Sequence, residues 1–245
     1  MGEIGAAGDT QAAYDAYQNI GNYLSSYGFN VDFAPVADVL TNVDNTVIGN
    51  RAFSSDAGVA AQMVSSAVTG LQETGVSACL KHFPGHGDTV EDSHYGTAYV
   101  RATLKELETQ EFVPFRAGIR AGADCVMIGH LVVPDISDQP ADLSETLVTD
   151  CLRNELAFHG LIITDSFQME AITDHYEPGE AAVRAIQAGV DLILEPEDLG
   201  ETVEGILTAS DKGELTEKRI DESVERILMA KQVNGIQMDH KIEKQ

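Results

Sequence analysis

The chain has 245 residues, of which 43% are hydrophobic and 22% charged, so it can bury the core of one large globular domain or two small ones. Its formal net charge of −25 argues against a nucleic-acid or membrane-surface partner, because such proteins meet phosphates with basic patches. No apolar run reaches the roughly 20 residues of a membrane-spanning helix, and no signal peptide opens the chain. We therefore predict a cytoplasmic protein for the chain as written, or an exported one if its natural N-terminus is missing.

The cysteines form an odd and sparse set, namely Cys79, Cys125 and Cys151. A disulfide framework needs an even number of cysteines at regular spacings. We therefore expect three reduced thiols, mostly buried in apolar segments.

Apolar periodicity predicts helices and strands that alternate along the chain. Helices are expected at residues 10–27, 56–74, 104–121, 143–158, 180–188, 199–212 and 216–234. Strands are expected at residues 30–36, 76–81, 124–130, 160–165 and 190–195. Strands that are almost wholly apolar and alternate with helices favour a parallel sheet buried on both faces. The pattern fits a (β/α)8 barrel or a doubly wound sheet. No linker interrupts it, so we expect one domain over residues 1–245.

Each predicted strand ends at or just before a polar residue: Asp38, Lys81, His130, Asp165 and Glu195. In parallel α/β folds, ligands bind at the carboxyl ends of the strands. The repeated pattern therefore predicts an active site at this edge of the sheet.

The first motif is the loop 81–88, with the sequence KHFPGHGD, directly after a strand. Lys81 and His82 can donate hydrogen bonds to sugar hydroxyls, and the glycines and proline allow the loop to bend. A solvated polar loop is the plainer interpretation. A metal site is a third, since His86 and Asp88 lie close to His82 and His94, although the helical His-x-x-x-His spacing is absent.

Three further motifs have a chemical and a plain interpretation each. Asp92 can orient and polarise His94 for proton transfer, or His94 can be an exposed loop residue. Asp165, after a buried strand, suits a nucleophile in glycoside hydrolysis, or it caps the next helix. Arg51, in the segment 48–53, can hold a hydroxyl or carboxylate, or form a surface salt bridge.

Taken together, these motifs resemble glycoside hydrolase family 3, and within it the bacterial β-N-acetylglucosaminidases. The matching segments are 32–38 (DFAPVAD), 48–53 (IGNRAF), 81–87 (KHFPGHG), 92–94 (DSH) and 163–166 (ITDS). The resemblance extends from about Tyr14 to about Lys231. The combination of KHFPGHG with DSH is its most specific part.

The resemblance implies a retaining β-N-acetylhexosaminidase on a (β/α)8 TIM-type barrel. Asp165 would attack the anomeric carbon, and His94, paired with Asp92, would protonate the leaving oxygen and then activate water. The expected substrate-binding residues are Lys81, His82, Arg51, His130 and Met169. Substrates would be β-N-acetylglucosaminides from glycan or peptidoglycan fragments. No cofactor and no metal are expected.

The chain departs from the family in one respect, because it has five predicted βα units where the barrel has eight. The five match the fourth to eighth units, so we expect an incomplete barrel without the first three. Three alternatives stay open: a catalytically inactive barrel fragment, a phosphorolytic relative that uses phosphate as acceptor, and a metal hydrolase built on the His/Asp loop.

Overall fold

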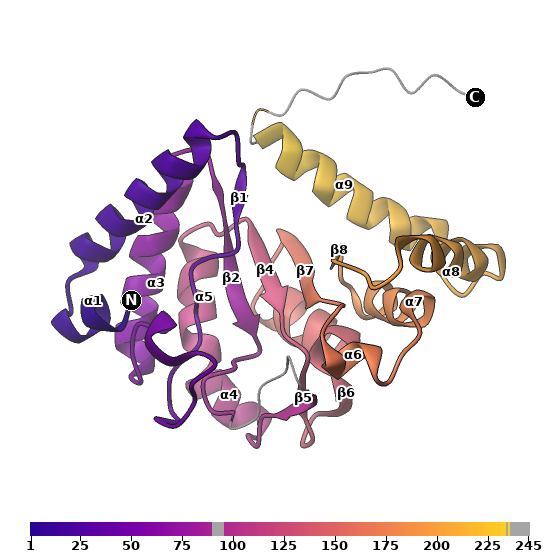
Figure 1. The fold of residues 1–245 in the computed structure, drawn as a ribbon, viewed down its shortest axis with the longest axis horizontal. Coiled ribbons are helices and arrows are strands. Elements are labelled where there is room, and N and C mark those ends of the chain that lie inside the picture. The colour runs from indigo at the N-terminus through magenta and orange to yellow at the C-terminus, as the bar shows by residue number, and fades with distance from the viewer. Residues whose placement is uncertain (90–95, 234, 236–245) are drawn as a thin grey trace.

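The computed structural model describes residues 1–89, 96–233 and 235 of the chain. Its centre is a curled parallel sheet of five strands in the order β1-β2-β4-β7-β8 (Figure 1). The strands are β1 (Val31–Asp32), β2 (Ser77–Phe83), β4 (Cys125–Ile128), β7 (Leu161–Ser166) and β8 (Leu192–Leu194). All four pairings are parallel, and the spatial order follows the chain order. This arrangement confirms the predicted incomplete TIM-type barrel.

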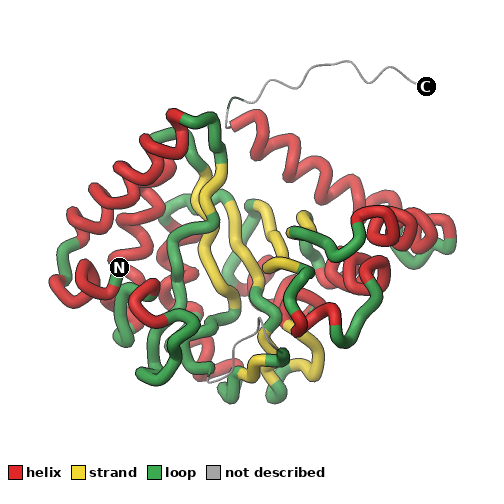
Figure 2. Tube along the Cα trace, viewed as in Figure 1, coloured by secondary structure: helices red, strands yellow, loops and turns green. Residues whose placement is uncertain are grey.

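Helices lie on both flanks of the strands, with α1 to α3 beside β1 and β2 and α7 to α9 beyond β8 (Figures 1 and 2). The longer helices are α2 (Thr10–Ser26), α3 (Ala57–Gln72), α7 (Pro178–Ala188), α8 (Leu199–Asp211) and α9 (Glu217–Val233). Aspartates cap several of them; Asp9, Asp56 and Asp198 each accept backbone N–H groups of the first turn. These bounds agree with the predicted helices to within a few residues.

The predicted helix 104–121 is wrong in one respect, because it breaks into α4 (Leu104–Thr109) and α5 (Phe112–Arg120). Gln110 leaves helical geometry at the break, with φ −122° and ψ −78°. Pro114 explains it, since proline has no N–H for the carbonyl four residues earlier and its ring collides with that carbonyl. The break turns Glu111 inward, where it is buried.

Several short elements escaped the periodicity analysis. A second sheet of β3 (Ala98–Tyr99), β5 (Leu131–Val133) and β6 (Ser137–Pro140) follows the carboxyl ends of the main strands. The remaining pieces are α1 (Gly2–Ala7), α6 (Glu170–Thr173), and the 3-10 turns η1 (Gly49–Arg51) and η3 (Ala141–Leu143). The predicted helix 143–158 is shorter, and it forms the wide π-type helix η4 (Thr146–Glu155).

The two faces of the main sheet have different surroundings. Between the sheet and its helices lies the large core, which includes Phe83, Phe112 and Phe115. On the inner face a small apolar cluster forms from Cys79, Cys125, Met127 and Ile163. All three cysteines are buried and unpaired, as predicted. Among the described residues, no helix is both long and apolar enough to span a membrane.

Candidate active site

Parallel pairing brings the polar strand ends to one edge of the sheet, in the lower part of Figure 1. Val36 bridges Lys81, Phe83 pairs with Ile128, and Ile128 pairs with Thr164. The residues that follow these positions, His82, His130 and Asp165, are therefore carried by adjacent strands. Of the predicted residues, Asp92 and His94 lie outside the described part of the chain.

Asp165 is half-buried at the end of β7, where its Oδ1 accepts the N–H of Ser166 at 2.8 Å. Helix α6 is instead capped by Met169, without a side-chain hydrogen bond. The plain interpretation of Asp165 as a helix cap is therefore not what the structure shows. Burial is the largest influence on the pKa values of Cys79, His86 and His130, and it leaves the pKa of His86 lowered; the negative charge of Asp165 is a smaller influence that acts upward on all three. Asp165 thus lies within electrostatic range of residues on or just after β2 and β4.

A buried carboxylate, Asp38, organises the loop after β2. Its Oδ1 accepts the backbone N–H of His86 at 2.7 Å, and its Oδ2 lies 2.8 Å from Nδ1 of His82. The backbone N–H of His82 also points at Oδ1, at 3.1 Å. Burial alone would raise the pKa of Asp38, but His82 and the hydrogen bonds lower it below its usual value. Asp38 is therefore a carboxylate that fixes both histidines.

The far side of the same loop is held by uncharged polar groups. Asn45 donates to the carbonyl of His86 at 2.7 Å, and Thr89 Oγ1 lies 2.7 Å from Nδ1 of His86. Gly87 packs so tightly on Val39 that an added Cβ would lie 1.9 Å from the Val39 carbonyl oxygen. His86 is buried, and that burial lowers its pKa although Asp38 opposes the effect. The plain interpretation of a solvated loop therefore does not hold for residues 82–87.

His130, a predicted substrate-binding residue, has no exposed surface. Its Nδ1 lies 3.0 Å from Oδ2 of the equally buried Asp142, and its Nε2 lies 2.8 Å from the carbonyl oxygen of Ser166. Burial would lower the pKa of His130, but Asp142 and these hydrogen bonds raise it. Both ring nitrogens are engaged by the protein, and one of them supports the strand that carries Asp165. A direct contact of His130 with a sugar remains only a prediction.

Lys81 and Arg51 line a common hollow of about 600 Å³ beside β1 and β2. Burial raises the pKa of Asp32 above its ordinary value, and the ammonium of Lys81 partly offsets this shift. The guanidinium of Arg51 donates to the Val47 carbonyl, with Nη2 at 2.8 Å. Met169 is buried just after β7. Lys81 and His82 thus come from β2, Asp165 comes from β7 on the far side of β4, and Arg51 joins Lys81 from the loop between β1 and α3.

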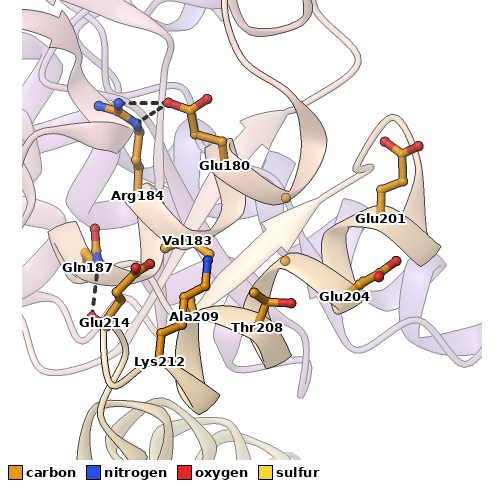
Figure 3. A pocket seen from close by; sticks show the side chains of 12 residues that line it. Glu180, Val183, Arg184, Gln187, Glu201, Glu204, Thr208, Ala209, Lys212 and Glu214 are labelled. Atoms are coloured by element: carbon orange, nitrogen blue, oxygen red, sulfur yellow. Dashed lines mark hydrogen bonds and ion pairs between the residues drawn. The ribbon is translucent and has the colours of Figure 1, made fainter.

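A separate hollow of about 670 Å³ lies between α7 and α8 (Figure 3). Its walls carry Glu180, which is paired with Arg184, and Glu201, Glu204 and Glu214. Its lining comes from α7, α8 and the residues just after α8 and includes no strand residue, so we do not place the active site there. Within the described residues, no group of three histidines, cysteines or carboxylates could hold a metal ion.

Two buried acidic residues, Asp142 and Glu111, had no clear signal in the sequence. Asp142 lies 12 residues after His130, in the turn η3, and no spacing rule links them. Glu111 lies inside a predicted helix, and only Pro114 indicated that this helix would break.

The chain is similar to known proteins over most of its length. The family model for the glycosyl hydrolase family 3 N-terminal domain matches residues 2–230. A β-hexosaminidase of Stenotrophomonas maltophilia is 44% identical over 169 residues, which are 68% of this chain and 49% of that protein. The chain thus spans about half the length of this curated relative.

Solved structures extend the match to nearly the whole chain. A family 3 β-N-acetylglucosaminidase from a Paenibacillus species superposes with a TM-score of 0.93 at 40% identity, over 99% of this chain and 47% of that one. A β-glucoside phosphorylase superposes with a TM-score of 0.91 at 27% identity, over 96% and 45%. The chain therefore belongs to glycoside hydrolase family 3.

Proposed function

We propose that this chain carries the catalytic strands of a retaining β-N-acetylhexosaminidase that removes terminal β-linked N-acetylglucosamine. The observation that carries the proposal is the position of Asp165: a half-buried carboxylate at the end of β7, next to the strand that leads to His130 and one strand further from β2, which carries Lys81 and His82. The names of the Stenotrophomonas and Paenibacillus proteins support the choice of substrate.

In the first step, an oxygen of Asp165 attacks the anomeric carbon while the bond to the leaving oxygen breaks. His94, oriented by Asp92, donates its proton to that oxygen, so the aglycone leaves as an alcohol and a glycosyl-aspartate remains. The hydrogen bond from the Ser166 N–H to Asp165 Oδ1 leaves Oδ2 as the attacking atom. A histidine suits the acid role because its ordinary pKa lies near neutrality.

In the second step, His94 accepts a proton from water, and the water oxygen attacks the anomeric carbon from the face that the leaving group vacated. The bond to Asp165 breaks and the carboxylate is regenerated, so the configuration is retained. Lys81, His82 and Arg51 would hold the sugar hydroxyls, and Met169 would contact the ring. These assignments rest on the family motifs and on the common hollow that Lys81 and Arg51 line.

Phosphate is the second candidate acceptor. A neutral His94 repels an anion less than a carboxylate base would, and a structural neighbour is named a phosphorylase. Phosphorolysis would yield N-acetylglucosamine 1-phosphate when a phosphate oxygen attacks the anomeric carbon of the same glycosyl-aspartate and the bond to Asp165 breaks, without removal of a proton from water. Product analysis in phosphate buffer therefore distinguishes the two acceptors.

The test is release of nitrophenol from the aryl β-N-acetylglucosaminide. It should be run on this chain and on a chimera in which the Stenotrophomonas relative supplies the first three βα units of the barrel. We expect the chain alone to be weakly active or inactive and the chimera to turn over. In the chimera, Asp165→Asn should lower kcat by about 10³-fold or more, because a neutral amide cannot form the intermediate.

The exposed Asp174 provides a matched control, since Asp174→Asn removes the same charge nine positions further along the chain. This control should keep nearly full activity. Robust turnover by the 245-residue chain alone would refute the need for a complete barrel. An active Asp165→Asn chimera would overturn the proposed nucleophile.

A further inference from the structure

Glu111 is a buried carboxyl group for which the proposed mechanism has no use. Only 4% of the residue is exposed, and it lies at the break between α4 and α5 that Pro114 causes. Burying a carboxyl group is costly unless it is neutral or well paired. No ion pair of Glu111 occurs among the described residues. Its retention in the core therefore needs an explanation.

The carboxyl group of Glu111 packs directly against the loop after β2. An added Cβ on Gly85, whose φ is +133°, would lie 2.5 Å from Oε2 of Glu111 and 2.8 Å from its Cβ and Cγ. The same Oε2 faces the N–H of Val39 at 3.4 Å. Gly85 and Val39 are each adjacent to a member of the hydrogen-bonded pair His86 and Asp38. Glu111 thus contacts both chain segments that meet beneath the histidines.

The charges around Glu111 are mostly negative. Asp38 faces it from the segment after β1, and Asp88 faces it from the loop end. Glu111 lines a hollow of about 290 Å³. Glu106 from α4, Arg101 and Asp88 line the same hollow. Burial first, and then Asp38, raise the pKa of Glu111 to about 8, with only the Val39 N–H acting in the opposite direction. At neutral pH the carboxyl group of Asp38 is therefore charged, and that of Glu111 keeps its proton.

We propose that Glu111 is a positioning residue whose uncharged carboxyl group holds the turn at Gly85 and His86 in place, and whose ionisation releases that turn. A second negative charge beside Asp38 would repel the carboxylate that fixes His82 and His86. The histidines would then lose their common anchor at the strand end. The inference deepens the proposed function and rests on it for the catalytic consequence, whereas the release of the turn does not depend on it.

The catalytic test uses Glu111→Gln, which keeps the shape of the side chain and removes its titration. It is made in the chain or chimera that turns over the aryl glycoside. The protonated fraction of a group with a pKa of about 8 falls about tenfold between pH 7 and pH 9. The ratio of kcat/KM for Glu111→Gln to that of the parent should therefore rise about tenfold over this range. This ratio cancels the titration of His94, which both proteins share.

Glu108→Gln is the matched control, since it removes a carboxylate three residues away on α4, one whose side chain is only partly buried. Its ratio to the parent should stay constant with pH. A merely structural role for Glu111 would lower activity equally at both pH values. An unchanged ratio for Glu111→Gln would therefore overturn the inference.

A second measurement does not need activity. The N–H of His86 donates to Asp38 and the N–H of Gly85 donates to the His82 carbonyl at 2.8 Å, so amide hydrogen exchange reports on the turn. At pH 9 both amides should exchange about tenfold faster in the parent than in Glu111→Gln, and at pH 7 about equally. Equal exchange at both pH values would refute the release. If exchange behaves as expected but no glycoside is turned over, the proposed function fails and the positioning role stands.

Discussion

The central and outer strands of the main sheet differ in length, burial and edge pairing. The central strands β2, β4 and β7 are four to seven residues long and mostly buried. The outer strands β1 and β8 have two and three residues in regular pairing, and each has one edge without a partner strand among the described residues. Their flanking helices expose large apolar side chains, such as Tyr27 near β1 and Leu207 on α8.

This difference separates the chemistry from the closure of the barrel. Each buried polar network of the candidate site includes a central strand: His82 on β2 contacts Asp38 from the segment after β1, and His130 after β4 contacts Asp142. The outer strands leave backbone groups and apolar surface open, which favours pairing with further strands. On the inner face, a mostly apolar hollow of about 350 Å³ extends from Val31 on β1 to Ile227 on α9. The polar contacts of the candidate site therefore involve the central strands, whereas each outer strand has one edge without a partner strand among the described residues.

The largest stability effect should come from breaking the central network at His130. In His130→Ala the Asp142 carboxylate stays buried without its partner, and the Ser166 carbonyl loses its donor. Removing one member of a buried ion pair costs about 3–5 kcal/mol. We expect the free energy of unfolding in urea to fall by about that amount.

The exposed His175 serves as the control for this substitution, since His175→Ala should change stability by less than about 0.5 kcal/mol. Equal losses of unfolding free energy in the two variants would show that the buried pair of His130 and Asp142 stabilises the protein no more than an exposed histidine does. The comparison between central and outer strands would then fail at its strongest point.

Most of the fold could be predicted because buried parallel strands and amphipathic helices have simple periods. All five main strands were expected, and so were the helices that flank them. The short elements were missed because two- to four-residue strands such as β3 and β6 have no period to detect. The break at Gln110 was missed because the apolar period continues through it, although Pro114 contradicts a continuous helix.

The residues of the candidate site that lie at strand ends could be predicted. The hydrogen-bonded pairs that hold them in place could not. Lys81, His82 and Asp165 follow apolar strands, so parallel topology places them at one edge. Asp38 was also expected at this edge, but its pairing with His82, 44 residues away, was not, and neither was the pairing of Asp142 with His130, 12 residues away. Such pairings depend on tertiary packing, and one sequence carries no period or spacing that reveals them.

A smaller effect is expected at Arg226, which ties α9 to the start of β8. Its Nη1 lies 2.9 Å from Oδ1 of the buried Asp191, while Arg153 binds the other oxygen. Ser223 also donates to Asp191, at 2.7 Å, so the carboxylate stays partly satisfied without Arg226. Because the Arg226 side chain is 29% exposed, Arg226→Ala should cost only about 1 kcal/mol in urea unfolding.

Arg116 pairs with Glu155 at 3.4 Å on the surface and provides the matched substitution. Arg116→Ala should have no measurable effect, or one below about 0.5 kcal/mol. A loss of more than about 3 kcal/mol in Arg226→Ala would show that the outer helix α9 is bound to the sheet as firmly as the central strands are bound to one another.

The smallest effect is expected on the open flank itself. Leu207 on α8 is 61% exposed, so Leu207→Ala should change the free energy of unfolding by less than about 0.5 kcal/mol. The same substitution at Leu80, fully buried in β2, should cost about 2–5 kcal/mol, because it leaves a cavity in the core. Urea unfolding at several protein concentrations measures both. If Leu207→Ala instead destabilises the chain by more than about 1 kcal/mol, and more so at high concentration, the α8 surface is buried against a second copy in solution. The difference between the buried strand β2 and the exposed helix α8 would then hold only for the isolated chain, because association with a second copy would bury the surface of α8.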